Sequence, residues 1–189
     1  YNKEGFEKLK KEFNEAEQSD FFVLYILLIY GFNRMLRFNS QGKYNLPVGN
    51  VDFNKNVLNA LNDYFKLVDQ KNISWYNLDY KKFLQVITFE KNDFIYFDPP
   101  YLITFSEYNK LWSEENEKDL IETLNELDSR NIKWAISNVT EYKNKTNSIF
   151  LVWSMKYNVY PIKSNYISYH DNSVKLFNEV LVTNYGKIS

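Results

Sequence analysis

The sequence contains no cysteine, only five glycines and four prolines, and a single histidine in 189 residues. Without cysteine the chain forms no disulfide, no thiolate zinc site and no thiol nucleophile, so it is indifferent to the redox state of its compartment. His170 has no partner motif near it, and we interpret it as an ordinary residue rather than a general base. Several common kinds of active site are therefore excluded.

The chain also lacks an excess of charge of either sign. Its 23 basic and 24 acidic residues give a net charge of −1, so no overall positive field draws it to nucleic acid. Four basic residues lie close in sequence with asparagine and aromatic residues between them: Arg34, Arg37, Lys43 and Lys55. Such a cluster suits phosphate contacts combined with base-edge readout, and a solvated surface of mixed charge has the same composition.

No apolar run is long enough to span a bilayer. The run over residues 21–32 is too short, and we predict that it is a buried helix capped by Asp20. No signal peptide is evident. From these features we expect a cytoplasmic protein.

Aromatic residues make up 19% of the chain and hydrophobic residues 44%, enough for a substantial core. Periodicity predicts helices over residues 3–17, 54–68 and 114–128, the last capped by Ser113 with three glutamates in its first turn. Residues 39–52 are predicted to be a loop or hairpin, and residues 102–112 a long connection. Strands are predicted over residues 73–76, 94–97 and 132–137, with an antiparallel pair over 155–162 and 176–185. This alternation favours an α/β sheet.

The tetrapeptide Asp98-Pro99-Pro100-Tyr101 is the most informative feature of the chain. It closes the apolar run 94–97, which we predict to be a buried strand, and open α/β sheets place active sites at the carboxyl ends of such strands. Proline fixes its own φ, has no N–H and favours an extended residue before it. Asp98 and Pro99 are therefore held out of helical geometry, with their carbonyls pointing outward as acceptors.

This corner suits a planar amino group, because Asp98 adds a carboxylate acceptor and Tyr101 a flat face for stacking. Accepting both hydrogens of an adenine amino group would help to localise its lone pair toward an incoming methyl group, without metal or covalent intermediate. The alternative is a proline-rich turn with Tyr101 as a core aromatic. The tetrapeptide arises by chance in about one sequence in a thousand of this size, which favours the functional interpretation.

Several segments in the same order resemble the Dam-like DNA adenine methyltransferases. Residues 32–39 and 42–49 are similar to the family's target-recognition pattern, N-G-x-x-R-x-N followed by G-x-F-N-x-P-F-G, with Arg34 in place of the usual glycine. Residues 133–138 match a family strand that ends in Ser-Asn, and residues 179–185 match its closing strand. With the tetrapeptide, these segments cover most of the chain.

The resemblance implies a methyltransferase that uses S-adenosyl-L-methionine and flips its target adenine out of the duplex. The catalytic residues would be Asp98, Pro99, Pro100 and Tyr101, with Asp98 and the Pro99 carbonyl accepting the amino hydrogens and Tyr101 stacking on the ring. Asp98 would also contact the cofactor. Asp79 would lie near the adenosyl moiety, and a helix cap is an equally good interpretation of it.

The resemblance also implies a set of contacts to double-stranded DNA. Asn33 and Arg37 would contact the DNA, Pro47 would lie against a base, and Phe32 would fill space in the opened duplex. Arginine at position 37 suits a guanine edge. A GATC target is compatible with the resemblance, as is a restriction-modification system or a bacterial or phage Dam system.

The family's Gly-rich F-x-G-G-G loop, which holds the cofactor, is not in the sequence, because no two of the five glycines of this chain lie close enough together to form it. We therefore expect an α/β, Rossmann-like methyltransferase sheet that is incomplete at its amino-terminal side, completed by an amino-terminal half or a second subunit. We assign residues 1–72 to a helical target-recognition insert and residues 73–189 to the catalytic α/β part.

Two other functions remain open from the sequence. One is a truncated, inactive DNA-binding remnant, because the Gly-rich loop is missing. The other is a methyltransferase that acts on RNA or on a protein amide, because related tetrapeptides serve those substrates. Aspartate rather than asparagine at position 98, together with residues 32–49, favours DNA adenine.

Overall fold

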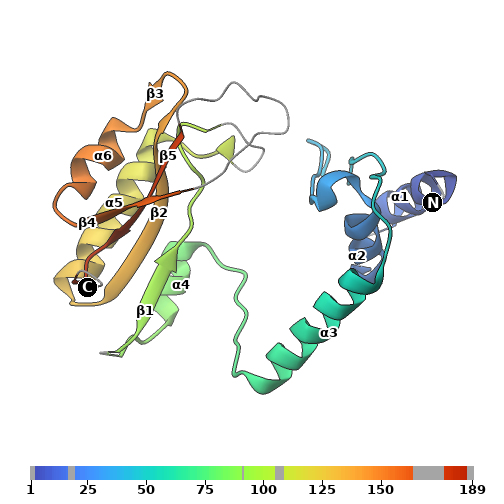
Figure 1. The fold of residues 1–189 in the computed structure, drawn as a ribbon, viewed down its shortest axis with the longest axis horizontal. Helices are drawn as coiled ribbons and strands as arrows, with labels where there is room; N and C mark the ends of the chain where they lie inside the picture. The colour runs from blue at the N-terminus through green and yellow to red at the C-terminus, as the bar shows by residue number, and fades with distance from the viewer. Residues whose placement is uncertain (1–2, 17–19, 91, 105–108, 164–176, 187–189) are drawn as a thin grey trace. The chain divides into compact units, whose positions relative to one another are not determined.

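The computed structural model describes residues 3–16, 20–90, 92–104, 109–163 and 177–186 (Figure 1). The chain divides into two compact units, Tyr1–Trp75 and Tyr76–Ser189. This division falls at Trp75, slightly later than the boundary after residue 72 that the sequence suggests. His170, which we interpret as an ordinary residue, lies outside the described residues. No described helix is long and apolar enough to cross a membrane.

The first unit is mainly helical. It contains α1 (Lys3–Glu15), α2 (Phe21–Tyr30), the short 3₁₀ helix η1 (Phe32–Arg34) and α3 (Lys55–Gln70). Asp20 caps α2 as predicted, because its Oδ1 accepts from the backbone N–H groups of Phe22 and Val23. The core of the unit combines two helices with the segment that follows them, through Phe6, Phe13, Leu27, Tyr44 and Leu46.

The prediction that α2 is a buried helix is wrong for its first turn. Phe21 is 79% exposed and Phe22 is 85% exposed, whereas Leu27 and Ile29 are buried. A helix that packs against one layer buries one side only, even when its sequence is apolar all round. The helix predicted over residues 54–68 is confirmed as α3. Of its apolar residues, Val57 is buried, whereas Leu58 and Phe65 are exposed.

Residues 31–49 form a hairpin, which overlaps the loop or hairpin predicted over residues 39–52 but begins earlier. The N–H of Phe32 donates to the Pro47 carbonyl (2.9 Å), and the N–H of Asn45 donates to the Arg37 carbonyl (3.1 Å). Gly42 has a φ of +73° in the turn, a conformation that glycine adopts without strain. Near the base, a Cβ on Gly49 would lie 2.7 Å from the Gly31 carbonyl oxygen, so the two arms need glycine to approach this closely.

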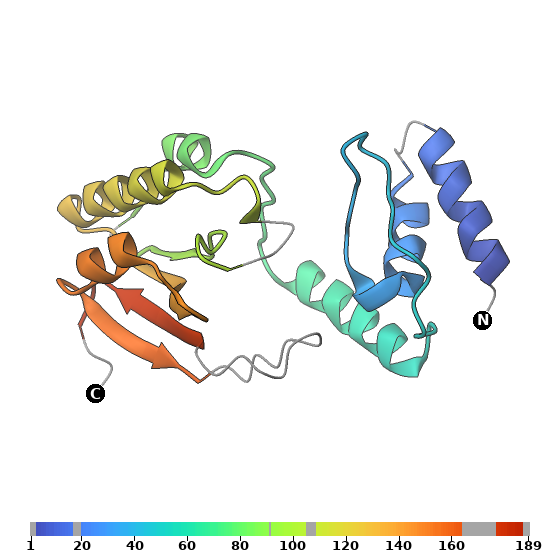
Figure 2. The same ribbon diagram turned by 90° about the horizontal axis from the view of Figure 1, so that it is seen from above.

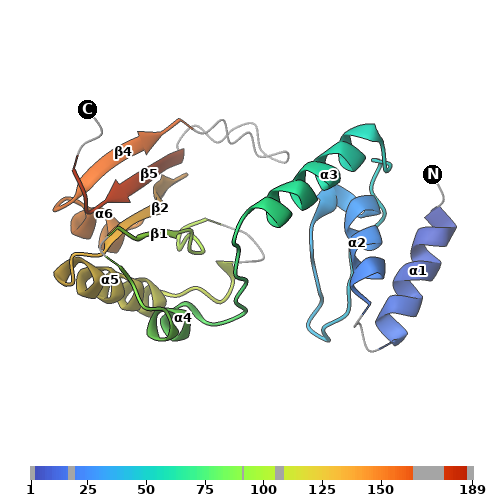
Figure 3. The ribbon, with the colours of Figure 1, turned by 90° about the horizontal axis from the view of Figure 1, so that it is seen from below.

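The second unit is an α/β domain with a mixed sheet, as predicted (Figures 2 and 3). The strand order is β1-β2-β5-β4, and β3 pairs with β2. β1 and β2 are parallel, and the other pairs are antiparallel. The strands are β1 (Phe94–Phe97), β2 (Lys133–Tyr142), β3 (Lys145–Thr146), β4 (Asn158–Ile162) and β5 (Phe177–Thr183). The antiparallel pair expected near the carboxyl terminus is confirmed as β4 and β5.

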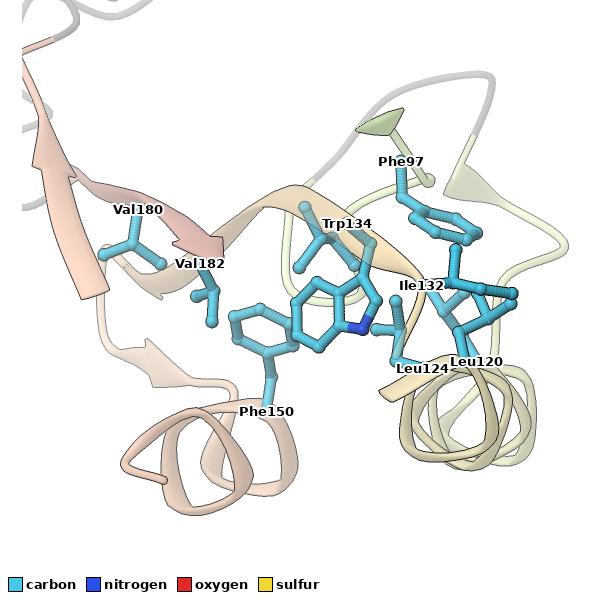
Figure 4. Packing of buried hydrophobic residues seen from close by; sticks show 10 residues of the cluster. Phe97, Leu120, Leu124, Ile132, Trp134, Phe150, Val180 and Val182 are labelled. Atoms are coloured by element: carbon cyan, nitrogen blue, oxygen red, sulfur yellow. The ribbon is translucent and has the colours of Figure 1, made fainter. Parts of the chain in front are cut away.

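Three helices accompany the sheet, α4 (Tyr80–Val86), α5 (Glu114–Ser129) and α6 (Ser148–Ser154). α5 begins with the predicted Ser113 cap, reinforced by a capping box with Asn116. α5 and α6 lie against the same face of the sheet, where Trp134 of β2 packs between Leu124 of α5 and Phe150 of α6 (Figure 4). Neither α6 nor β3 was predicted from the sequence.

Two strand predictions need correction. Residues 73–76 form no strand. β1 is a strand as predicted but is not buried, because Phe94 is 51% exposed and Tyr96 is 55% exposed. The physical reason is its position at one edge of the described sheet, where only the face that carries Phe97 is covered by helices.

Candidate active site

The Asp-Pro-Pro-Tyr corner begins where β1 ends. The parallel register pairs Phe97 of β1 with Ile136 of β2. The next residues of the two segments, Asp98 and Ser137, therefore lie side by side. The Asp98 side chain is exposed, and Tyr101 is half-buried. The corner therefore presents a carboxylate to solvent at the carboxyl end of a parallel strand, the position at which α/β sheets bind ligands.

The alternation of side chains along the strands separates the core from the site. Trp134 and Ile136 of β2 point into the helix-covered core, and so do Val180 and Val182 of β5. Because successive side chains point to opposite faces, Ser137 lies on the face without α5 and α6. Residues of β1, β2 and β5 meet there through Tyr96, Ser137 and Glu179.

Five hydrogen-bonding side chains converge on this face. The Ser137 hydroxyl donates to Oδ1 of Asp98 (3.2 Å) and accepts from the Tyr96 hydroxyl (3.0 Å). The Tyr101 hydroxyl donates to Oε1 of Glu179 (2.9 Å) and also lies 3.3 Å from the Ser137 hydroxyl. Ser137 itself is only 2% exposed, so its position is fixed by packing as well as by these bonds.

Each hydroxyl has one proton, and this decides which bonds form together. If Tyr101 donates to the carboxylate of Glu179, the shorter and charge-assisted bond, it has no proton left for Ser137. Ser137 then accepts from Tyr96 and donates to Asp98. The arrangement gives each carboxylate one hydroxyl donor and leaves Oδ2 of Asp98 available as an acceptor.

The Tyr101 hydroxyl is held in its protonated form. Burial raises the pKa of Tyr101 well above its ordinary value. The Ser137 hydroxyl lowers this pKa by less than burial raises it, and the Glu179 carboxylate raises it further. Tyr101 therefore remains a hydrogen-bond donor at neutral pH. Its ring is fixed at both ends, by the proline corner and by the bond to Glu179.

Behind this site, on the core face of β2, lies a buried carboxylate. Glu117 of α5 is fully buried. Its Oε1 accepts from the side-chain amides of Asn138 (2.9 Å) and Asn147 (2.7 Å), and its Oε2 accepts from the indole N–H of Trp112 (2.7 Å). Asn138 is the neighbour of Ser137, so the carboxylate joins β2 to the start of α6 and to the end of the connection that follows the tetrapeptide.

Asp79 is the N-cap of α4. Its Oδ1 accepts from the backbone N–H of Lys81 (3.0 Å), which is the structural role that the sequence left open beside a cofactor contact. The cap engages one carboxylate oxygen. The other carboxylate oxygen of Asp79 can still contact a ligand, so the capping role neither supports nor contradicts a cofactor contact.

The described residues offer carboxylates rather than a glycine cradle for a cofactor. No group of three or more histidine, aspartate or glutamate side chains in the described part of the chain could hold a metal ion. Within the second unit the sequence has one glycine, Gly186. At the Asp98 corner the exposed group is the Asp98 carboxylate, a hydrogen-bond acceptor.

The residues expected to contact DNA lie together in the first unit. Phe32 and Pro47 face each other across the base of the hairpin through their backbone hydrogen bond. Arg37 projects from the same hairpin, where its Nε donates to Oδ1 of Asn45 (2.9 Å) and its Nη2 to the Asn45 carbonyl (3.1 Å). Asn33 has a φ of +53° in η1. One small element thus carries all four residues.

Three residues of the second unit were not singled out as site residues from the sequence: Ser137, Glu179 and Glu117. Ser137 and Glu179 lie in segments with a recognised resemblance, but their contacts to Tyr101 span 36 and 78 residues. A polar residue inside an apolar strand was the available signal for Ser137. Glu117 resembled any other acidic residue in the first turn of a helix.

The mixed sheet, with an acidic proline corner at the end of a parallel strand, defines a methyltransferase-like α/β protein. A model of the D12 class N6 adenine-specific DNA methyltransferase family matches residues 1–179. The chain belongs to this family, which confirms the resemblance described above.

Individual relatives agree with this assignment. The type II methyltransferase M.FokI of Planomicrobium okeanokoites is 33% identical over 193 residues, which cover 97% of this chain. The modification methylase LlaI of Lactococcus lactis subsp. lactis is 35% identical over 192 residues, again 97% of the chain. The chain spans 29% of the length of each of these two proteins. The type II methyltransferase M1.LlaDCHI of Lactococcus lactis subsp. cremoris is 24% identical over 87% of the chain and 57% of its own length.

Proposed function

We propose that this chain carries the catalytic corner and the target-recognition hairpin of a DNA adenine methyltransferase that uses S-adenosyl-L-methionine. The observation that supports this most directly is the Asp98 carboxylate, exposed at the end of a parallel strand and held by Ser137. Oδ2 of Asp98 and the Pro99 carbonyl are acceptors at the same corner. Two such acceptors match the two hydrogens of an adenine amino group.

The adenine must leave the duplex to reach this corner, because its amino group is paired inside the helix. Asp98 and the Pro99 carbonyl then accept its two hydrogens, which draws the nitrogen lone pair out of conjugation with the ring. The Asp98 carboxylate also stabilises the positive charge that develops on the nitrogen as its bond to the methyl carbon forms. Tyr101 stacks on the base, and its bond to Glu179 fixes the ring before the base arrives.

S-adenosyl-L-methionine, when bound, supplies the electrophilic methyl group. Within this chain we propose Asp98 and Asp79 as its contacts. Each engages one carboxylate oxygen within the protein, Asp98 with Ser137 and Asp79 with the backbone of Lys81. The second oxygen of Asp79 is an acceptor for the hydroxyl or ammonium hydrogens of such a ligand. Oδ2 of Asp98 has two lone pairs, so it can accept one such hydrogen beside the adenine amino hydrogen.

The hairpin is the proposed reader of double-stranded DNA. Arg37, oriented by Asn45, would read a guanine edge, and Asn33 would bind beside it. Pro47 would lie against a base, with Phe32 filling space left by the flipped adenine. We propose GATC as the first target to test, and a role in the modification arm of a restriction system or in a Dam system.

The proposed reaction leaves a chemical product that can be measured directly. The protein that carries these residues, expressed in cells without adenine methylation, is expected to place N6-methyladenine in their DNA, detected by mass spectrometry of digested nucleosides. The Asp98→Ala variant is expected to place far less, in line with a transfer rate lower by about a hundredfold or more. Binding of duplex DNA without this product would indicate the inactive remnant instead, and methyl groups on RNA or protein would indicate the other alternative.

Arg37→Ala is expected to weaken binding of the cognate duplex by about 1–3 kcal/mol and to relax the preference at one base pair. The reason is that a guanidinium held by Asn45 is preorganised for two bonds to guanine. The measurement is a titration against duplexes that differ at single positions. An equal loss on every sequence would make Arg37 a phosphate contact.

A further inference from the structure

The backbone at Arg34 adopts an unfavourable conformation. Its φ is +51°, and the preceding Asn33 has a φ of +53°. Asparagine enters this left-handed region comparatively easily, because its short polar side chain bonds locally, whereas a long unbranched cation has no such compensation. An arginine that persists in this conformation points to a functional reason for its side chain.

The conformation is imposed by the hydrogen bonds around it. The Arg34 N–H donates to the Gly31 carbonyl (3.1 Å), which closes η1 directly after α2. The arms of the hairpin are then tied by the bonds from Phe32 to Pro47 and from Gly49 to the Tyr30 carbonyl (2.7 Å). The chain must reverse direction between α2 and the hairpin. The positive φ at Arg34 is therefore required by this turn and not by the Arg34 side chain.

The Arg34 side chain is exposed, and no hydrogen bond or ion pair joins it to other residues in the part of the chain that the structure describes. Arg37, in the same hairpin, is instead held by Asn45. Arg34 also lines an open cavity of about 550 Å³ together with Tyr25, Asn56 and Tyr64. A cation that is free to extend beside aromatic and amide groups suits an anionic partner whose position varies.

We propose that Arg34 is a DNA-phosphate contact of the recognition hairpin. The proposal rests on the proposed function, because DNA is the anionic partner of this hairpin. A guanidinium fixed by neighbours, such as that of Arg37, suits base readout, whereas an unfixed one suits the repeated charge of the backbone. The two arginines therefore have separate roles, with Arg34 contributing sequence-independent affinity and Arg37 contributing specificity.

Arg34→Gly tests this assignment because the substitution should lower the affinity for DNA without lowering the stability of the protein. Glycine adopts a positive φ without strain, so the thermal midpoint of unfolding should stay the same or rise. Affinity for duplex DNA should fall about threefold to tenfold near 0.1 M salt, and the slope of log affinity against log salt should shrink by about 0.9, equally on cognate and non-cognate duplexes. The measurement is a binding titration at several salt concentrations with the protein that carries these residues.

Two variants provide controls. Arg34→Lys keeps the charge and should keep the salt slope. Lys143→Gly is matched in type, because Lys143 is another basic residue at positive φ (+54°), with its ammonium 5.5 Å from the Tyr142 ring centroid. Its salt slope should equal that of the wild type.

The possible outcomes distinguish the Arg34 proposal from the proposed function on which it rests. Wild-type binding with the salt slope of a charged interface, together with an unchanged slope in Arg34→Gly, would overturn the Arg34 assignment alone. A wild-type protein without measurable affinity for duplex DNA would contradict the proposed function, and the Arg34 contact with it. A loss confined to one duplex sequence would show that Arg34 reads a base and would also reject a phosphate contact.

Discussion

Asp98→Ala is expected to reduce the rate of methyl transfer at saturating substrates by about a hundredfold to a thousandfold, the range seen when one preorganised group at a developing charge is removed. The carboxylate accepts an amino hydrogen before transfer and faces a positive nitrogen during it, so its contribution is larger in the transition state than in the bound substrate. The measurement is single-turnover transfer of a labelled methyl group to a duplex with one target adenine.

Binding of duplex DNA should change little in Asp98→Ala, because the proposed DNA contacts lie in residues 31–49 of the first unit. Asp69→Ala is a suitable control, since Asp69 is an exposed residue of α3. It should keep both the rate and the DNA affinity. A transfer rate in Asp98→Ala within a few-fold of the wild type would reject the mechanism proposed for this corner.

Ser137→Ala gives a graded test of the same network. Removing the hydroxyl leaves Asp98 present but without its 3.2 Å donor, so the carboxylate can rotate away from the position in which Oδ2 meets the base. We expect a loss of about tenfold, corresponding to one hydrogen bond of about 1.4 kcal/mol. In the Asp98→Ala background the same change should have almost no further effect, because the group that Ser137 positions is gone.

The fold class and the position of the Asp98-Pro99-Pro100-Tyr101 corner at the end of a strand could be predicted from the sequence, because both depend on local patterns. The run Phe94–Phe97 followed by Asp98 and two prolines specifies a strand and its end without information from distant residues. Asp20 and Ser113 identified two helix starts for the same reason, since a cap bonds to backbone groups two or three residues ahead.

What the sequence did not reveal depends on neighbours far along the chain. A run of four apolar residues fits a central strand and an edge strand equally well. The exposure of Tyr96 follows from the position of β1 at an edge of the described sheet, where it pairs with β2 alone. That position cannot be predicted from the four residues themselves. From the sequence, Glu117 was one of three glutamates in the first turn of a helix. Its burial is decided by Asn138 and Asn147, which are 21 and 30 residues away.

Glu117→Ala is expected to destabilise the second unit by about 3 kcal/mol or more, since each buried donor left without an acceptor costs about 1–3 kcal/mol. The substitution leaves three buried or half-buried donors without an acceptor, those of Trp112, Asn138 and Asn147. Urea unfolding followed by tryptophan fluorescence is the measurement, because Trp134 and Trp153 belong to the core of this unit.

Glu117→Gln separates the two halves of the network. The amide oxygen can still accept from Asn138 and Asn147, but the amide N–H₂ replaces Oε2 and meets the indole N–H of Trp112, so two donors face each other. We expect a loss of about 1.5–3 kcal/mol, the value of one hydrogen bond to a charged group. Glu122→Gln, on the exposed side of the same helix, should stay within about 0.5 kcal/mol of the wild type.

Trp112→Phe distinguishes a specific bond from a general need for a charge. Phenylalanine removes the opposing N–H, so the double variant with Glu117→Gln should be more stable than the sum of the two single losses predicts, by about 1 kcal/mol or more. Strict additivity would mean that Glu117 stabilises the unit through its asparagine partners alone. Coupling would show that the carboxylate anchors the end of the connection that follows Asp98-Pro99-Pro100-Tyr101, and so joins the stability of the core to the geometry of the catalytic corner.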